Sequence, residues 1–170
     1  MCNNGDDMKK LPKRKPTRLK NYNYSTPGMY FVTICTKDRK NILSDIIVGE
    51  GLRTLPINKL TIIGNVVEQS IKYVSSNYTG VKIDKYVIMP NHIHMIVVLE
   101  DSGGCGNPPL QEVIRRFKSF TSRECGNNLW QRSFHDHIIR GDEDYRKIWE
   151  YIDTNVLKWE QDVFYINSER

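Results

Sequence analysis

Short runs of β-branched and aromatic residues are interspersed along this chain with segments whose apolar residues are three or four positions apart. The runs predict strands, and the spaced segments predict helices. Runs rich in β-branched and aromatic residues predict strands over 29–36, 81–90 and 92–100, with a further candidate strand in 129–140. Apolar positions three and four residues apart predict amphipathic helices over 58–77, 110–123 and about 142–157. The stretch 37–57 shows neither spacing and is predicted as loop.

The order of these elements constrains the fold. It runs strand, helix, strand, strand, helix, strand, helix, so strands and helices do not alternate strictly, which argues against a doubly wound parallel sheet. The short Pro90-Asn91 connection suits two adjacent antiparallel strands. We therefore predict one α+β domain with a mainly antiparallel sheet and helices packed against one face.

Composition places the chain among ordinary globular proteins. It has 170 residues, 39% hydrophobic and 26% charged, and no apolar run approaches the roughly 20 residues that span a bilayer. No secretory signal is apparent. Four scattered cysteines (Cys2, Cys35, Cys105 and Cys125) form no CxxC pair, which disfavours a zinc ribbon or a disulfide scaffold. We expect a cytoplasmic protein without membrane partners.

The net charge of +5 is concentrated at the N-terminus. Seven basic and two acidic residues lie in the first 20, whereas the remaining 150 carry 18 of each. We therefore predict a basic arm, 1–20, attached to a single neutral domain, 21–170. The arm is either a solubilising tail or a contact for a polyanion such as DNA or RNA, and composition leaves both open.

Two histidines interrupt the apolar run "MPNHIHMIV" at 89–97. Side chains two residues apart on a strand share a face, so His92 and His94 are expected to project together while Ile93 and Met95 face the core. Parallel neutral imidazoles suit a divalent metal. The alternative is that each histidine is only hydrogen-bonded on a solvated face, and a metal would need a further ligand from elsewhere.

A second pair, His135 and His137, has the same spacing. One hypothesis joins the two pairs in the four-histidine cluster of a metal-dependent hydrolase, although Asp136 would then point away from its neighbours. The other interpretation makes the second pair a polar face that lines a groove, or simply surface.

The segment "WEYIDTN" at 149–155 offers a nucleophile. On a helix, positions four apart lie within about 40° of each other, so Tyr151 and Asn155 share a face. A tyrosine hydroxyl beside a metal can act as a covalent nucleophile, and an asparagine oxygen suits Mg²⁺ or Mn²⁺. The alternative is a tyrosine that only packs on the sheet. Tyr145, six residues earlier, falls on another face.

Together these segments resemble the single-tyrosine HUH transposases, where U is a hydrophobic residue, and within them the REP-associated tyrosine transposase branch. The run 89–97 matches the branch's MPNHxH motif. The segment 129–155 is similar to its second motif, in which a strand bearing aromatic residues and histidines leads into the tyrosine helix. The segment 18–39 is similar to its N-terminal block, with Gly28 and Tyr30 in a Gly-x-Tyr position.

The resemblance implies a ferredoxin-like antiparallel sheet and an enzyme that cuts and rejoins single-stranded DNA. His92 and His94 would bind Mg²⁺ or Mn²⁺, Asn155 would complete the metal site, and Tyr151 would attack the scissile phosphate to give a 5′-phosphotyrosine. The expected partner is single-stranded DNA with a hairpin, REP-like or from a transposon end. The resemblance also implies a nucleoid-associated protein that acts as a monomer or a homodimer.

Several residues are expected to contact DNA, through phosphates for the basic side chains and through backbone approach or base stacking at the Gly-x-Tyr position. They are Arg14, Lys15, Arg18, Gly28, Tyr30, Arg115, Arg116, Lys118, His135 and His137. An alternative function is a DNA-hairpin-binding module on the same fold that no longer cleaves. The intact tyrosine and histidines favour the enzyme, and the hydrolase hypothesis would make Tyr151 dispensable.

Overall fold

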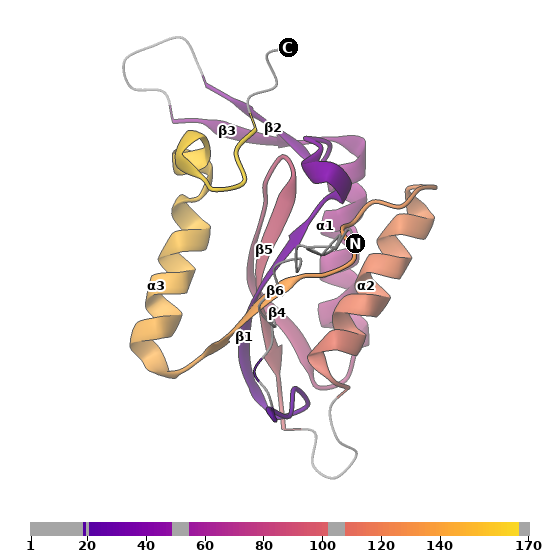
Figure 1. The fold of residues 1–170 in the computed structure, drawn as a ribbon, viewed down its shortest axis with the longest axis vertical. Helices are drawn as coiled ribbons and strands as arrows, with labels where there is room; N and C mark the ends of the chain where they lie inside the picture. The colour runs from indigo at the N-terminus through magenta and orange to yellow at the C-terminus, as the bar shows by residue number, and fades with distance from the viewer. Residues whose placement is uncertain (1–18, 20, 49–54, 102–107, 167–170) are drawn as a thin grey trace, which may run out of the picture.

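The computed structural model describes residues 19, 21–48, 55–101 and 108–166. Most of the predicted arm, with Arg14, Lys15 and Arg18, lies outside this range. A four-stranded antiparallel sheet in the order β4-β5-β1-β6 forms the centre of the fold (Figure 1). Its strands are β1 (Gly28–Cys35), β4 (Val81–Ile88), β5 (His92–Leu99) and β6 (His135–Ile139).

Within the described ranges, three helices and a small second sheet surround this centre. The helices are α1 (Ile62–Asn77), α2 (Leu110–Glu124) and α3 (Gly141–Thr154). Two short 3₁₀ segments, η1 (Lys37–Arg39) and η2 (Val156–Gln161), follow β1 and α3. Strands β2 (Ser44–Ile47) and β3 (Ile57–Leu60) pair antiparallel with each other. Among the described residues, no helix is long and apolar enough to cross a bilayer.

The predicted antiparallel α+β fold is confirmed, and three element boundaries are corrected. The predicted loop 37–57 contains η1, β2 and the first residue of β3. The first helix begins at Ile62 rather than at 58, because the Thr61 side chain accepts a hydrogen bond from the Gly64 amide (3.0 Å) and caps the helix there. In the candidate segment 129–140, only 135–139 forms a strand.

Gly64 explains how α1 packs so closely on the chain that precedes it. A Cβ added at this position would lie 1.9 Å from the carbonyl oxygen of Leu43. That same oxygen accepts hydrogen bonds from the Thr61 amide (3.0 Å) and hydroxyl (3.1 Å), so it is fixed in place. A residue without a side chain is therefore required where α1 crosses Leu43.

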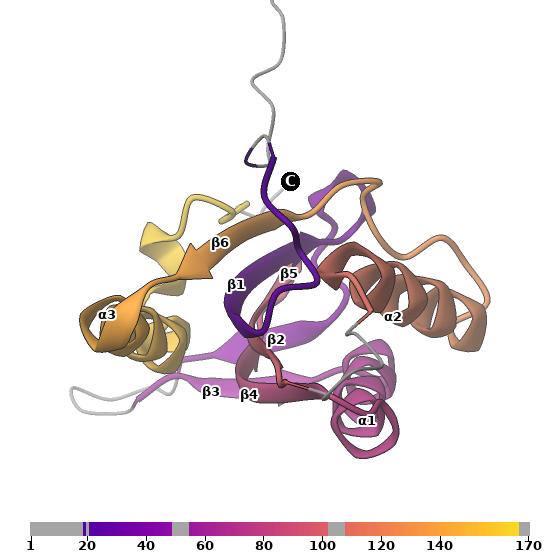
Figure 2. The same cartoon turned by 90° about the horizontal axis from the view of Figure 1, so that it is seen from below.

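The two faces of the sheet are covered by different helices, which corrects the prediction of helices on one face. Helices α1 and α2 cover the face that carries Val32 and Met95, and this side forms the main core. Helix α3 lies on the opposite face, where Ile152 packs in a small cluster with Ile96 and Ile139 (Figure 2). Apolar residues at successive positions of β5 make both faces of the sheet apolar, and each face needs a cover.

Candidate active site

The histidine pair lies on β5, on the face that α3 covers. The exposed fractions of His92 and His94 are 0% and 1%, and their Nε2 atoms lie 3.0 Å apart. Ile93 and Met95 point to the other side and join the main core. The shared face predicted from strand periodicity is therefore confirmed, whereas a solvated face for these imidazoles is excluded.

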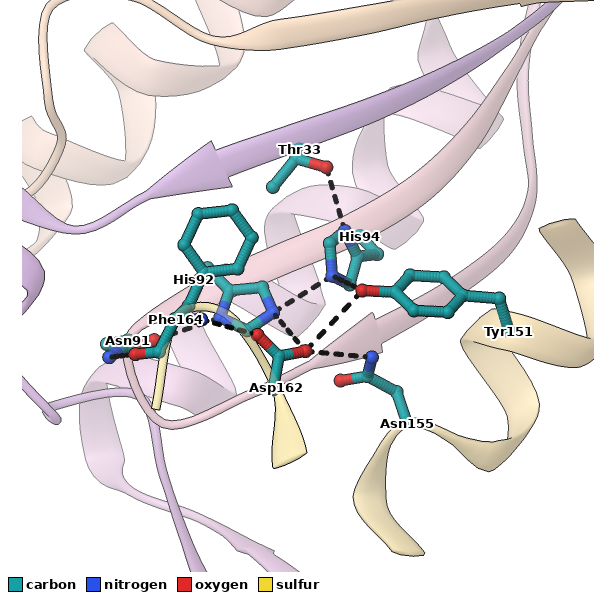
Figure 3. A network of polar contacts seen from close by, with 8 residues as sticks. All are labelled: Thr33, Asn91, His92, His94, Tyr151, Asn155, Asp162 and Phe164. Atoms are coloured by element: carbon teal, nitrogen blue, oxygen red, sulfur yellow. Dashed lines mark hydrogen bonds and ion pairs between the residues drawn. The ribbon is translucent and has the colours of Figure 1, made fainter. Parts of the chain in front are cut away.

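Hydrogen bonds at Nδ1 fix the orientation of both rings (Figure 3). Nδ1 of His92 bonds to Oδ1 of Asn91 (2.9 Å), and the Asn91 amide nitrogen donates to the carbonyl of Phe164 (2.8 Å). Because a carbonyl only accepts, Oδ1 of Asn91 must face the imidazole, and Nδ1 of His92 carries the proton. Nδ1 of His94 bonds to the Thr33 hydroxyl (2.8 Å). The Nε2 atoms are thereby directed into the site, as in metal-binding histidines.

Burial makes both imidazoles neutral. Desolvation lowers the pKa of His92 to about 3, with a further contribution from the positive charge of Arg39. Desolvation also lowers the pKa of His94 to about 3, assisted by His92 and opposed by the negative charge of Asp162. Neutral imidazoles are the form that binds a metal, so no proton has to leave first at neutral pH.

Tyr151 projects from α3 toward the histidines of its own chain. Its hydroxyl lies 3.2 Å from Nε2 of His94 and 3.4 Å from Oδ2 of Asp162 (Figure 3). The side chain is 40% exposed, so the phenol is reachable from solvent as well as from the site. Burial and the nearby carboxylate of Asp162 raise the pKa of Tyr151, and a hydrogen bond with Asn155 partly offsets this. The phenol is therefore protonated at neutral pH.

Asn155, one turn beyond Tyr151, is buried at the same site. Its amide nitrogen donates to Oδ2 of Asp162 (3.2 Å), whereas its Oδ1 is buried without a hydrogen-bond partner in the described part of the chain. A buried amide oxygen without a partner is costly unless something outside the protein binds it. The predicted convergence of Tyr151 and Asn155 on one side of α3 therefore agrees with the structure.

Asp162 is the site residue that the sequence analysis did not identify. The 3₁₀ segment η2 turns the chain back after α3, and Oδ1 of Asp162 accepts the Phe164 amide (2.7 Å), which holds the carboxylate inward. Oδ2 lies 4.0 Å from Nε2 of His92. The available signal was an acid in an aromatic segment soon after the tyrosine helix, but Glu160 lies two residues before it, so the sequence did not single out Asp162.

These donors fit a divalent cation. One ligand atom from each of His92, His94 and Asp162 lies within 4.8 Å of the other two, and all three side chains are buried or nearly so. Two imidazole nitrogens and a carboxylate oxygen form a mixed set that binds metals such as Mn²⁺, and the unpartnered Oδ1 of Asn155 adds an oxygen donor of the kind that Mg²⁺ favours.

The second histidine pair does not join this site. Among the described residues, the only group of three or more histidines, cysteines or acids that could hold a metal consists of His92, His94 and Asp162. His137 instead bonds to Asp144 (2.8 Å), which also accepts the Arg140 amide (2.9 Å) at the start of α3. His135 is exposed on the edge strand β6. The four-histidine hydrolase cluster is therefore wrong.

Two of the expected DNA contacts are corrected. Tyr30 is fully buried in the main core, and its hydroxyl donates to the carbonyl of Thr26 (2.6 Å), so its ring cannot stack on a base. The ammonium of Lys118 donates to the backbone carbonyls of Gln131, Arg132 and Ser133, so it organises a loop instead of standing free for a phosphate.

The other expected contacts within the described residues are accessible. Arg115 and Arg116 are exposed, and both pair with Glu112 (2.7 and 2.6 Å). Gly28 opens β1 at φ +155°, in a conformation that favours glycine. Their contact with DNA stays a prediction, as it does for His135 and His137.

Known proteins with similar sequences include members of one named class. No family model matches the chain. An uncharacterised Haemophilus influenzae protein is 35% identical over 91% of this chain and 94% of its own length. A REP-associated tyrosine transposase of Escherichia coli is 33% identical over 45% of each chain. A second Haemophilus influenzae protein, provisionally named a REP-associated tyrosine transposase, is 25% identical over 82% of this chain and 77% of its own.

The fold has a counterpart of the same class. The solved structure of a REP-associated tyrosine transposase bound to a REP hairpin matches 84% of this chain and 73% of that chain, with a TM-score of 0.62 and 24% identity. The two proteins share a fold. The chain is therefore similar in sequence to REP-associated tyrosine transposases and shares the fold of one of them.

Proposed function

We propose that this protein cleaves and rejoins single-stranded DNA beside a hairpin, with Tyr151 as the nucleophile. The observation that carries the proposal is the distance of 3.2 Å between the Tyr151 hydroxyl and Nε2 of His94. A phenol this close to a set of metal donors is well placed to attack a phosphodiester held by them. A solved relative is bound to a REP hairpin, and the proposal extends a DNA hairpin ligand to this chain.

His92, His94 and Asp162 would hold a Mg²⁺ or Mn²⁺ ion, with Oδ1 of Asn155 as a fourth donor. When bound, such a cation would polarise the non-bridging oxygens of the scissile phosphate and add positive charge beside the phenol. The hydrogen bonds from Asn91 and Thr33 keep both Nε2 atoms turned toward that position, so they are positioning contacts.

The Tyr151 oxygen forms the new bond. As it attacks phosphorus, its proton passes to solvent, which reaches this partly exposed residue. The Tyr151 O–P bond forms, the bond from phosphorus to the 3′ oxygen breaks, and the 3′ oxygen takes up a proton from solvent. The products are a 5′-phosphotyrosine and a free 3′-OH. Attack by the 3′-OH of another DNA end reverses these steps and joins the strands.

A covalent-adduct assay tests this proposal. Single-stranded oligonucleotides with imperfect hairpins and labelled ends are incubated with the protein and Mg²⁺ or Mn²⁺, then separated under denaturing conditions. We expect an adduct with the wild type and none with Tyr151→Phe. Tyr145→Phe is the matched control, because Tyr145 lies on the same helix but bonds to Asp84 (2.7 Å) instead of facing the histidines.

Hairpin binding should persist in Tyr151→Phe, because the ring that packs edge-on against Phe31 (6.0 Å between centroids) is kept. If no hairpin oligonucleotide gives an adduct with either metal while the wild type still binds it, the protein is the binding module without cleavage. If Tyr151→Phe retains the adduct, the nucleophile is another residue.

A further inference from the structure

A groove lined by both polar and apolar side chains lies between α2 and the segment 128–134, on the side of the sheet away from α3. Its volume is about 640 Å³. Helix α2 contributes Gln111, Arg115, Lys118 and Ser119 to its lining, and the segment contributes Asn128, Gln131 and Arg132. Buried Trp130 and Phe134 are also part of the lining. Sites that bind small ligands span roughly 300–1,000 Å³, so the space is large enough for part of a polymer chain.

The charge of the groove is of one sign. Among the residues that the structure describes, its lining contains three basic residues and no acid. Arg115 shares Glu112 with Arg116, so those three side chains keep one positive charge in excess. Arg132 is exposed and makes no hydrogen bond or ion pair through its guanidinium within the described part of the chain. The groove therefore attracts an anion with a cation that is not already used.

The neutral side chains point to a polymer that is read by hydrogen bonds. The side-chain amides of Gln111, Asn128 and Gln131 make no hydrogen bonds to the rest of the described protein, so their donors and acceptors are available. Trp130 and Phe134 are only 3% and 6% exposed, so stacking on a base is excluded. Guanidinium and amide groups together suit the phosphates and base edges of a nucleic-acid strand.

The segment that forms one wall of the groove is linked to the strands that carry the histidine site. The backbone N–H of Gln131 donates to the carbonyl of Cys35 (3.0 Å), and Cys35 lies opposite His92 in the β1–β5 register. The segment then enters β6 (Figure 1). There His135 lies opposite Thr33, the residue that bonds to His94. One continuous stretch of chain therefore connects the groove to the strand beside the catalytic face.

We propose that this groove binds one strand of the DNA that flanks the cleavage point. Arg132 and Arg115 bind its phosphates, while Gln111, Asn128 and Gln131 contact base edges. This inference rests on the proposed function, because it takes DNA as the substrate. Lys118 acts as a positioning residue, since its bonds to the carbonyls of 131–133 hold the wall of the groove in place.

The test measures binding without cleavage. In the full chain carrying Tyr151→Phe, the affinity for a fluorescent hairpin oligonucleotide with single-stranded flanks is measured by anisotropy at several salt concentrations. We expect Arg132→Glu to weaken binding at least about tenfold, and Arg132→Ala to lower the salt dependence by about one released counterion. Arg123→Glu is the control, because Arg123 is also an exposed arginine and lies on α2 outside the groove lining.

A second variant tests the amides separately from the charge. Gln131→Ala should weaken binding of the natural flanks and leave the salt dependence unchanged. If Arg132→Glu and Arg123→Glu weaken binding equally, the groove is not the strand site, whatever the adduct assay gives. If Arg132 variants lose binding while the wild type never forms an adduct, the groove stands and the cleavage proposal fails.

Discussion

The two faces of the central sheet differ in what they bury. The face under α1 and α2 is closed by aliphatic and aromatic side chains in one large cluster. The face under α3 has an apolar cluster with three buried members among the described residues, and beside it two imidazoles, an amide and a carboxylate. The apolar cluster of the second face is the smaller of the two, so this face should stabilise the fold less, and it carries the candidate active site.

This contrast teaches where the protein tolerates change. On the first face, removing a methylene group leaves a cavity, and the effect is a lower free energy of unfolding. On the second face, the polar side chains are fixed by one another and by Asn91 and Thr33, so the cost of a substitution should appear in metal binding and cleavage. The predictions below separate these two readouts.

We expect the largest effect from His94→Ala. Without one of the two imidazoles, the metal site loses a ligand. Adduct formation should therefore fall by more than about a hundredfold, which exceeds the usual effect of losing a residue that only hydrogen-bonds a ligand. Thermal stabilisation by Mn²⁺ should disappear as well, because it depends on metal binding to the folded state. If His94→Ala is still stabilised by Mn²⁺ as the wild type is, the metal binds elsewhere.

Ile93, next to His94 but on the other face, should affect stability and leave metal binding unchanged. Ile93→Ala truncates a fully buried side chain of the main core and should lower the free energy of unfolding by about 2–5 kcal/mol, measured by urea denaturation. The Mn²⁺ affinity of the folded variant should match that of the wild type. A large loss of metal affinity in Ile93→Ala would mean that the two faces are coupled through β5.

Asp162→Asn tests the charge that the sequence did not reveal. Metal affinity should fall about 10- to 100-fold by titration calorimetry, because an acidic donor is replaced by a neutral amide of the same size. The pKa of Tyr151 should fall, since the Asp162 charge raises it. Subtracting the absorbance titration of the double variant Asp162→Asn/Tyr151→Phe from that of Asp162→Asn isolates the signal of the Tyr151 phenol. A Tyr151 pKa equal to that of the wild type would contradict the contact between Tyr151 and Asp162.

Thr33→Val removes a smaller contribution. The variant keeps the shape of the side chain but leaves Nδ1 of His94 without a partner, and we expect about a tenfold loss of Mn²⁺ affinity. Ser70→Ala is the control, because it removes a buried hydroxyl on the α1 side, where it bonds only to the carbonyl of Val66. Equal effects of the two variants would show that general destabilisation, not ring orientation, is responsible.

Regular periodicity explains which parts could be predicted from the sequence. The period of two placed His92 and His94 on one face, and the helical period brought Tyr151 and Asn155 together. The same period of two places Tyr30 on the face of Val32, which is the core side, so the base-stacking hypothesis conflicted with information already in the sequence.

The remaining features depend on contacts without a period. Asp162 reaches the site through a 3₁₀ segment and a turn closed by its own side chain, and neither leaves a repeating pattern. Strands β2 and β3 have four residues each, too few for an alternation to be distinguished from loop. The position of α3 on the second face follows from tertiary packing of Ile152, which its helical spacing alone does not specify.

The smallest effect should come from the surface contact that ties α3 to the sheet. The Lys85 ammonium lies 2.6 Å from the Asp153 carboxylate and 3.7 Å from the centre of the Trp149 ring. Lys85→Met keeps the aliphatic stem and removes the charge, so the free energy of unfolding should fall by about 0.5–1 kcal/mol, and less at high salt.

Lys82→Met is the matched control, because Lys82 is an exposed lysine of the same strand that makes no hydrogen bond or ion pair to the other described residues. Urea denaturation and the adduct rate are measured for both variants. If Lys85→Met slows the adduct more than its loss of stability accounts for, the contact positions Tyr151 as well as holding α3. If the two variants are indistinguishable, the apolar cluster around Ile152 is sufficient to hold the helix, and the second face is more robust than its small core suggests.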